Sequence, residues 1–367
     1  MDELRAAGIE IFSTCPQSAN REPRDYLKQV VDVAQWSDDA GHRGMLVYTD
    51  NSLVDAWLLA QVVLQHTKEL CPLVAVQPVY MHPYTAAKIV ASLAFLHDRR
   101  IFLNMVAGGF RNDLRALDDD TEHDARYDRL VEYTTIVKGV LAAEESFSFE
   151  GRYYRVKNLR MTPPLPVELF PGITVSGSSE AGLGAARAIG ATAVKYPQPP
   201  SHENGRLPTE SIGFGMRAGV IARDTAEEAW RVAYERFPPS RKGQLTQQLA
   251  MKISDSKWHR QLSELAAHAA QHESPYWLGP FENYKTFCPY LVGSYETVAC
   301  ELGRYLHLGF RTFIIDIPWS PEDLVHIDVA FRQAARAAAE PSSAGIPASP
   351  AARQPPLADQ VPTTTAG

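Results

Sequence analysis

The chain has 367 residues, of which 45% are hydrophobic and 10% aromatic, so it has ample apolar surface for a large core and is not globally disordered. Its 36 basic and 43 acidic residues give a net charge of −7, which opposes binding to nucleic acid and to anionic lipid. No apolar run is long enough to cross a bilayer, and the first residues lack the order of a signal peptide. These features predict a cytoplasmic protein without nucleic-acid or membrane partners.

The four cysteines form no CxxC pair, which argues against a zinc site and against a disulfide framework. We therefore expect reduced thiols and no bound metal.

Short runs of β-branched residues alternate along the chain with longer segments whose apolar residues recur at helical spacing. Helical spacing predicts helices over residues 23–40, 53–67, 83–96 and 125–141. The apolar runs predict eight strands, over residues 8–12, 44–48, 72–77, 100–106, 172–176, 191–196, 212–222 and 311–317. Eight strands with eight helix-compatible crossovers favour an α/β fold, a (β/α)8 TIM barrel of about 250 residues. An open doubly wound sheet is the alternative, but the turn after the first strand lacks the glycines which that fold needs.

Residues 1–340 exceed the usual size of such a barrel, so we expect insertions near residues 143–171 and 239–290. The second of these is rich in aromatic residues, including Trp258, Tyr276 and Phe287, and is either a lid over the site or an ordinary packing excursion. Residues 341–367 hold six prolines and six alanines with no aromatic residue, which predicts a disordered tail.

In a barrel the functional residues lie on the loops that follow the carboxyl ends of the strands. The fifth predicted strand leads into Gly177, Ser178 and Ser179 at a helix start. Free backbone N–H groups, two hydroxyls and the positive end of the helix dipole suit a phosphate there. A plain serine N-cap explains the same residues equally well.

Two further loops carry polar residues beyond what a turn needs. The fourth strand contains Asn104 and is followed by Ala107 and two glycines. The chain then leads to His123 and Tyr127, whose spacing of four places both on one face of a helix. Asp50 follows the second strand and either accepts hydrogen bonds from a ligand ring or caps the helix that begins near Leu53, and the sequence favours the cap.

Taken together, these loops resemble the bacterial luciferase-like flavin-dependent monooxygenases, nearest the alkanesulfonate monooxygenase branch. The resemblance extends over roughly residues 8–335 and is specific as a set rather than in any single piece. The matching segments are YTDNSLVDAWLLA (48–60), LVAVQP (73–78), IFLNMVAGG (101–109), HDARYDRLVEY (123–133), FEGRYYRVKN (149–158), VSGSSEAG (175–182) and FGMRAGVIARDTAEEAW (214–230).

The resemblance implies a barrel that binds FMN, as FMNH2, in its mouth. It assigns cofactor binding to the positions of Asp50, Asn104, Ala107, His123, Tyr127, Gly177, Ser178 and Ser179. It also implies that one oxygen atom of O2 enters a small organic substrate through a flavin C4a-hydroperoxide. A separate NAD(P)H:flavin reductase would supply the reduced flavin, and a homodimer or homotetramer is the usual assembly.

The sequence departs from the alkanesulfonate branch near the pocket. Leu53 stands where those enzymes have Cys, Gly219 where they have His, and their Arg near Tyr284 and Tyr after the last strand are missing. Arg217 is kept as the candidate catalytic residue, to bind a hydroperoxide oxygen or a substrate anion, or else as a buried ion-pair partner. The substrate is therefore not expected to be a simple alkanesulfonate. An F420-dependent oxidoreductase and a non-catalytic flavin-binding barrel are the alternatives.

Overall fold

The computed structural model describes residues 2–19, 21–109, 111–203, 205–253, 262–265 and 274–339. The tail predicted over residues 341–367 and the aromatic residue Trp258 lie outside these ranges. Within them, no helix is long and apolar enough to span a membrane.

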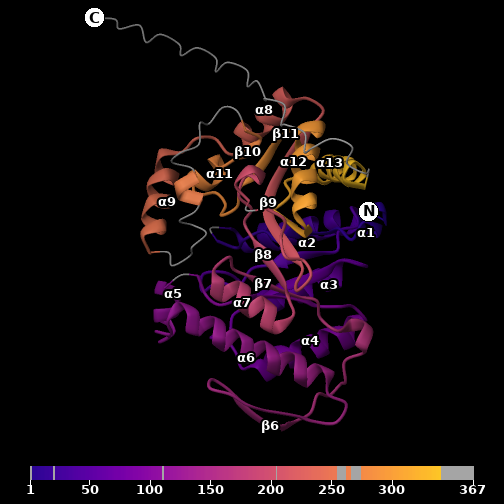
Figure 1. Cartoon of the computed structure of the whole chain (residues 1–367), viewed down its shortest axis with the longest axis vertical. Coiled ribbons are helices and arrows are strands. Elements are labelled where there is room, and N and C mark those ends of the chain that lie inside the picture. Colours follow the sequence, from indigo (N-terminus) through magenta and orange to yellow (C-terminus); the bar gives the residue numbers. More distant parts are fainter. Residues whose placement is uncertain are drawn as a thin grey trace, which may run out of the picture.

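Eight parallel strands close into a barrel, which confirms the (β/α)8 prediction (Figure 1). β9 pairs with both β8 and β12 and so joins the two ends of the row β12-β1-β2-β3-β4-β7-β8. Each of the eight predicted strands matches one of them. Their bounds are β1 (Glu10–Thr14), β2 (Gly44–Val47), β3 (Cys71–Val76), β4 (Phe102–Val106), β7 (Ile173–Ser176), β8 (Thr192–Lys195), β9 (Phe214–Arg223) and β12 (Phe310–Ile315).

Helices cover the outside of the barrel, and several begin at side chains that cap them. Asp55 accepts hydrogen bonds from Trp57 N and Leu58 N at the start of α3, and Ser294 accepts one from Thr297 N at the start of α12. The helices are α1 (Asp2–Ala6), α2 (Pro23–Asp39), α3 (Ala56–His66), α4 (Pro83–His97), α5 (Arg111–Ala116), α6 (His123–Ala142), α7 (Glu180–Ile189), α8 (Ala226–Arg236), α9 (Arg241–Ile253), α11 (Gly279–Glu282), α12 (Tyr295–Leu308) and α13 (Pro321–Ala339).

Two features of the second half differ from the prediction. The connection from β8 to β9, the sixth along the barrel, contains only the 3-10 turn Pro200–His202 among its described residues, so the expected helical crossover is wrong there. The chain also forms β11 (Tyr290–Ser294), which we did not predict, and the short antiparallel β10 (Tyr276–Trp277) beside it. β11 pairs with the second half of β9. Its apolar run is too short for the sequence alone to predict a strand there.

The first predicted insertion contains a hairpin of β5 (Phe147–Glu150) and β6 (Arg155–Leu159) and the 3-10 turn Val167–Leu169. Figure 1 shows the hairpin at one end of the long axis, with α8 and β11 at the other. Both carboxylate oxygens of Glu132 in α6 accept hydrogen bonds from the backbone N–H groups of residues 152–154, which ties the tip of the hairpin to the helix.

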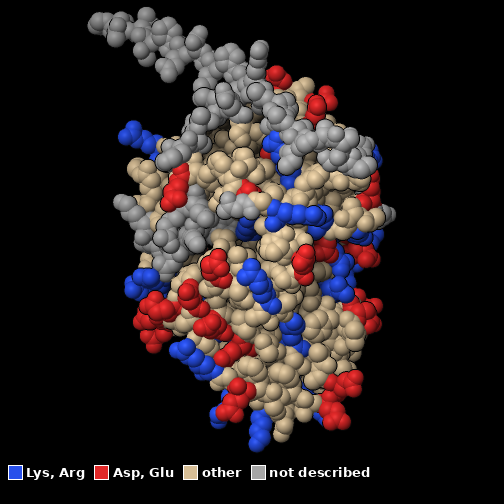
Figure 2. Space-filling view, in the orientation of Figure 1, with Lys and Arg blue, Asp and Glu red and all other residues tan. Residues whose placement is uncertain are grey.

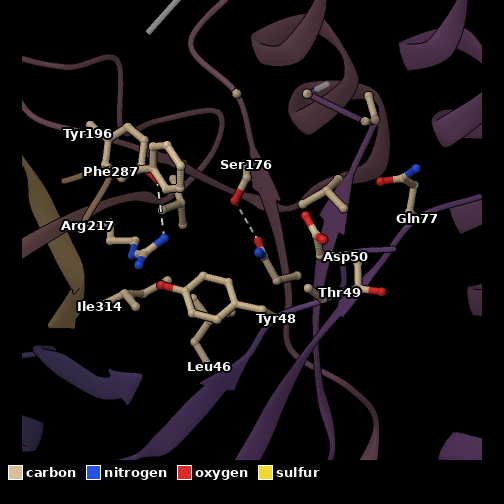
Figure 3. A pocket seen from close by; sticks show the side chains of 18 of the residues that line it. Leu46, Tyr48, Thr49, Asp50, Gln77, Ser176, Tyr196, Arg217, Phe287 and Ile314 are labelled. Carbon is tan, nitrogen blue, oxygen red and sulfur yellow. Dashed lines mark hydrogen bonds between the residues drawn. The ribbon is translucent and has the colours of Figure 1, made fainter. Parts of the chain in front are cut away.

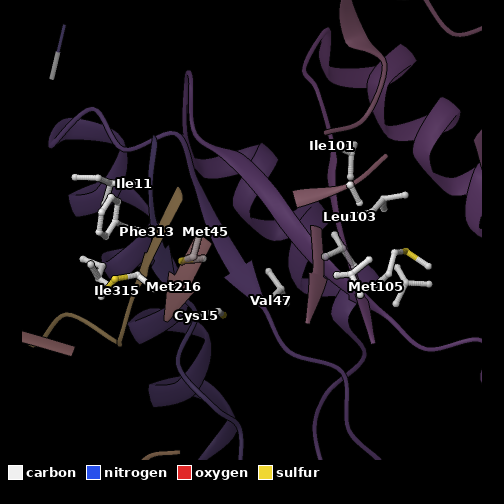
Figure 4. Packing of buried hydrophobic residues seen from close by; sticks show 14 of the residues in the cluster. Ile11, Cys15, Met45, Val47, Ile101, Leu103, Met105, Met216, Phe313 and Ile315 are labelled. Atoms are coloured by element: carbon white, nitrogen blue, oxygen red, sulfur yellow. The ribbon is translucent and has the colours of Figure 1, made fainter. Parts of the chain in front are cut away.

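The strand side chains alternate between two apolar layers. Ile11, Met45 and Phe313 point outward and join the large cluster under the helices (Figure 4). The neighbouring inward positions form a second cluster inside the barrel, made of Phe12, Leu46, Cys71, Leu73, Phe102, Val194 and Ile314. The rings of Phe12 and Phe102 meet edge to face, with centroids 5.2 Å apart. This interior cluster fills the barrel below its carboxyl end and leaves the site above it.

The interior cluster requires a residue without a side chain at Gly44. A Cβ on Gly44 would overlap the carbonyl oxygen of Cys71 and lie 2.9 Å from the ring of Phe12. We expect Gly44→Ala to lower the free energy of unfolding by roughly 2–3 kcal/mol, because backbone and a buried ring cannot both give way. Urea denaturation measures this. The control Gly184→Ala lies in α7, where the added Cβ meets nothing within 4 Å, and should raise stability by about 0.5–1 kcal/mol. Equal effects of the two substitutions would contradict the packing argument.

Candidate functional site

A cavity of about 290 Å³ opens at the carboxyl ends of the barrel strands (Figure 3). It is elongated: Arg217, Tyr48 and Tyr196 lie at one side and Asp50 and Gln77 at the other. All nine residues predicted from the sequence line this one cavity, namely Asp50, Asn104, Ala107, His123, Tyr127, Gly177, Ser178, Ser179 and Arg217. The fold therefore brings together positions that are up to 167 residues apart in the chain.

The two adjacent serines have different partners. Ser179 is the N-cap of α7, and its hydroxyl accepts a hydrogen bond from Gly182 N at 3.1 Å. The hydroxyl of Ser178 is buried and has no hydrogen-bond partner among the described residues. The plain N-cap explanation therefore accounts for Ser179 but not for Ser178. Because a buried hydroxyl without a partner costs free energy, Ser178 is suited to a ligand.

Gly177 leaves room for a tyrosine at the same end of the cavity. A Cβ on Gly177 would overlap the hydroxyl of Tyr127 in α6. Burial is the main cause that raises the pKa of Tyr127 above its ordinary value, so the hydroxyl keeps its proton at neutral pH. The ring of His123 meets that of Tyr127 edge to face at 5.3 Å. One end of the cavity thus gathers hydroxyl groups, an imidazole and the start of a helix.

Asn104 lies on the inward face of β4 with its amide held in one orientation. Its Oδ1 accepts hydrogen bonds from Thr174 Oγ1 and Ser176 Oγ, both at 2.8 Å. Figure 3 draws the bond from Ser176. Since two hydroxyls occupy the amide oxygen, the Nδ2 group remains as a donor toward the cavity that Asn104 lines. Ala107 directly follows the end of β4 and contributes backbone to the same wall.

The structure corrects the expectation for Asp50. The helix after the second strand begins at Ala56 and not near Leu53, and its cap is Asp55, so the favoured cap role of Asp50 is wrong. Asp50 Oδ1 instead accepts hydrogen bonds from Ser52 N and Ser52 Oγ at 2.8 and 2.5 Å. The side chain therefore shapes the loop at the cavity and leaves its second oxygen as an acceptor.

Aromatic rings and a carboxylate surround Arg217. Its guanidinium carbon lies 4.7 Å from the ring centroid of Tyr48 and 5.7 Å from that of Tyr196. Arg217 Nη1 donates to Tyr196 Oη at 3.3 Å, and Nη2 lies 3.6 Å from Asp316 Oδ1. Tyr290 donates to the other oxygen of Asp316 at 2.8 Å. Arg217 is therefore a buried ion-pair partner that also lines the cavity.

Tyr290 occupies the space above Gly219. The two residues are paired in the register of β11 and β9, and a Cβ on Gly219 would overlap the tyrosine ring. Burial raises the pKa of Tyr290, and likewise that of Tyr196, well above the ordinary value, so both remain hydrogen-bond donors. The ring of Tyr290 thus fills the space that a side chain at position 219 would occupy, and its hydroxyl donates a hydrogen bond to Asp316.

The sequence analysis missed several lining residues, although a period of two along the strands would have found them. Leu46 and Tyr48 continue the inward face of β2, and Val194 and Tyr196 that of β8. Lys195 also lines the cavity, and its Nζ pairs with Glu203 Oε2 at 2.5 Å. The floor is apolar and consists of Leu46, Ala75, Val194 and Ile314.

The described part of the segment 239–290 divides between core and cavity. Tyr276 donates its hydroxyl to Pro197 O at 2.7 Å, and Phe281 is buried. Phe287 lies at the cavity on the same side as Arg217 (Figure 3). A lid role for this segment stays a prediction.

Acidic side chains gather on the surface over α5 and the start of α6, where Asp118, Asp120 and Asp124 are exposed (Figure 2).

Comparison with known proteins gives consistent relatives. A family model described as luciferase-like monooxygenase matches residues 9–312. The 4-(gamma-L-glutamylamino)butanoyl-[BtrI acyl-carrier protein] monooxygenase BtrO of Niallia circulans is 36% identical over 309 residues, covering 83% of this chain and 90% of the relative.

Two solved structures share the fold at low identity. The oxygenating constituent of 3,6-diketocamphane monooxygenase from Pseudomonas putida, in complex with FMN, has a TM-score of 0.65 at 17% identity, covering 89% of this chain and 98% of that one. An F420-dependent secondary alcohol dehydrogenase has a TM-score of 0.61 at 16% identity, covering 89% and 99%. At these identities the likeness concerns the barrel alone.

Proposed function

Because the chain belongs to the luciferase-like monooxygenase family, we propose that it binds reduced FMN and transfers one atom of O2 to a small organic substrate. Bound FMNH2 would supply the two electrons and two protons that reduce the other oxygen atom to water. A separate NAD(P)H:flavin reductase would deliver the reduced flavin. A homodimer or homotetramer is the proposed assembly.

The buried, unpartnered hydroxyl of Ser178 is the observation that carries this proposal. It lies between Gly177, which has no side chain, and the capped start of α7, where backbone N–H groups and the helix dipole favour an anion. Placing the FMN phosphate at this position would provide the missing hydrogen-bond partner. The residues present therefore fit the group that the family binds.

The other lining residues fit the rest of the flavin. His123 and Tyr127 would hold the ribityl chain next to the phosphate. The Nδ2 donor of Asn104 and the free oxygen of Asp50 would meet the polar edge of the ring system. The apolar floor and Phe287 would keep water away from the reacting atoms, which limits wasteful reduction of O2.

The surroundings of Arg217 favour a substrate without a strongly anionic group. Asp316 already balances the guanidinium, so a sulfonate would have to compete with a fixed carboxylate. The relative from Niallia circulans is named for an acyl group held on an acyl-carrier protein. We infer that this chain acts on a substrate of the same class, with Arg217 as the residue that positions the acyl end.

The cofactor choice is tested by anaerobic titration with FMNH2 and, separately, with reduced F420. We expect saturable binding of FMNH2 and weaker binding of F420, followed by O2 uptake when the FMNH2 complex meets oxygen. Flavin fluorescence and an oxygen electrode are the measurements. Preference for F420 would make the chain an F420-dependent oxidoreductase, and tight flavin binding without substrate oxygenation would make it a non-catalytic flavin-binding barrel.

The phosphate placement is tested at the two serines. Ser178→Ala should weaken FMN binding by about 10- to 100-fold, the value of a charge-assisted hydrogen bond, without loss of stability. Ser179→Ala removes a helix cap and should also lower the free energy of unfolding by about 1 kcal/mol. Ser211→Ala, an exposed serine far along the chain, is the control and should change neither. Unchanged affinity in Ser178→Ala would mean that the phosphate lies elsewhere.

The substrate class is tested with FMNH2 and ¹⁸O2. The acyl-carrier thioester named for the relative should gain one labelled oxygen atom, read by mass spectrometry, whereas an alkanesulfonate of similar length should not be turned over. Efficient oxygenation of the sulfonate would refute the argument from the Arg217 and Asp316 pair.

A further inference from the structure

A second cavity, of about 550 Å³, opens at the opposite end of the barrel, where the strands begin. Its walls include Arg5 of α1, Arg43 just before β2 and Arg311 of β12. The interior cluster around Phe12 and Phe102 separates it from the candidate flavin site. It is therefore a different site, and the proposed function does not use it.

The charges lining this cavity are unbalanced. Three arginines face it with one carboxylate, that of Glu10, in a chain whose net charge is −7. Glu10 Oε1 lies 3.3 Å from Arg43 Nε, so it is already paired. Within the described residues, Arg5 and Arg311 have no carboxylate partner. The cavity thus carries an excess of two positive charges.

Backbone carbonyls hold the two uncompensated guanidinium groups in place. Arg5 Nη2 donates to Gly41 O at 3.0 Å. Arg311 Nη1 donates to Leu306 O and Phe310 O at 2.7 and 2.8 Å, which leaves its other nitrogens as donors. Burial and the nearby Arg206 lower the pKa of Arg311, as expected where cations face one another without an anion.

Hydroxyl groups complete the donor set. Thr312 follows Arg311 in β12, and Thr192 is the first residue of β8; both line the cavity. Guanidinium forks together with hydroxyls match the oxygens of a tetrahedral phosphate. Arg311 and the two threonines stand on barrel strands and Arg5 on α1, and both arginines are exposed, so their guanidinium groups are open to an anion from solvent.

We propose that this cavity binds a phosphate-bearing anion, either inorganic phosphate or the phosphate group of a metabolite. Arg5 and Arg311 bind its oxygens, Arg43 adds positive charge, and the threonine hydroxyls donate. The anion is neither the flavin nor the oxygenation substrate, because the interior cluster separates it from the reacting atoms.

The test locates the anion on the wild-type protein with FMN bound, so that phosphate cannot report on the flavin site. Phenylglyoxal modifies accessible arginines, and peptide mass spectrometry reads the extent at each position. Inorganic phosphate at millimolar concentration should slow modification of Arg5 and Arg311 at least several-fold, relative to sodium chloride of equal ionic strength. Arg231, which is exposed on α8 and pairs with Glu235 at 2.7 Å, is the control and should react equally in both. Equal rates at Arg5 and Arg311 in both salts would overturn the proposal.

Calorimetric titration supplies the second measurement and distinguishes the source of the anion. Arg5→Met and Arg311→Met should each weaken phosphate binding about tenfold or more, since each removes a charge-assisted partner. Arg231→Met should bind as the wild type does. ATP binding more tightly than phosphate would identify a metabolite, and equal affinities would identify free phosphate. Wild-type affinity in both Arg5→Met and Arg311→Met would place the anion elsewhere and refute the proposal. FMN binding by these variants tests the other site independently.

Discussion

Every second side chain of a barrel strand points inward, and the pairing of β9 with both β8 and β12 makes these inward positions converge on one axis. Residues near the strand starts, such as Phe12 and Phe102, meet there and fill the interior. Residues two positions further along, such as Asn104, face the same axis above that filling and line the cavity. Closure of the barrel therefore positions both the apolar floor and the polar walls of the candidate flavin site.

The late part of the chain adds a constraint of its own. β9 is long enough to pair with β12 through its first half and with β11 through its second half. This arrangement sets Tyr290 against Gly219 and aims its hydroxyl at Asp316. Asp316 in turn pairs with Arg217, so a contact between two strands determines the charge at the Arg217 side of the cavity. A side chain at position 219 would displace the tyrosine, and with it the support of the ion pair.

The sequence was sufficient for the eight barrel strands because most of them are apolar on both faces and read as continuous runs. β11 was not predicted because its apolar run is short and its pairing with β9 is a tertiary contact. Asp50 was predicted to be a cap because the helix was expected to begin near Leu53, and the residue that caps a helix depends on the exact turn at which the helix starts. The division of roles between Ser178 and Ser179 was equally hidden, since adjacent serines differ only once one of them bonds to Gly182 N. The resemblance identified which loops matter, whereas the pairing of Arg217 with Asp316 needed the fold.

The two ends of the barrel handle positive charge in opposite ways. In the cavity at the carboxyl ends of the strands, Lys195 and Arg217 are each paired with a carboxylate, and the proposed phosphate position offers a hydroxyl and a helix start. A hydroxyl and a backbone N–H group lack the net positive charge of a guanidinium, so they add no ion-pair attraction to the hydrogen bonds that they donate to an anion. At the second cavity, where the strands begin, Arg5 and Arg311 have no carboxylate partner among the described residues, so an anion there would meet two uncompensated positive charges. One chain of net charge −7 thus pairs its cations with carboxylates at one end of the barrel and leaves two arginines without a carboxylate partner, among the described residues, at the other.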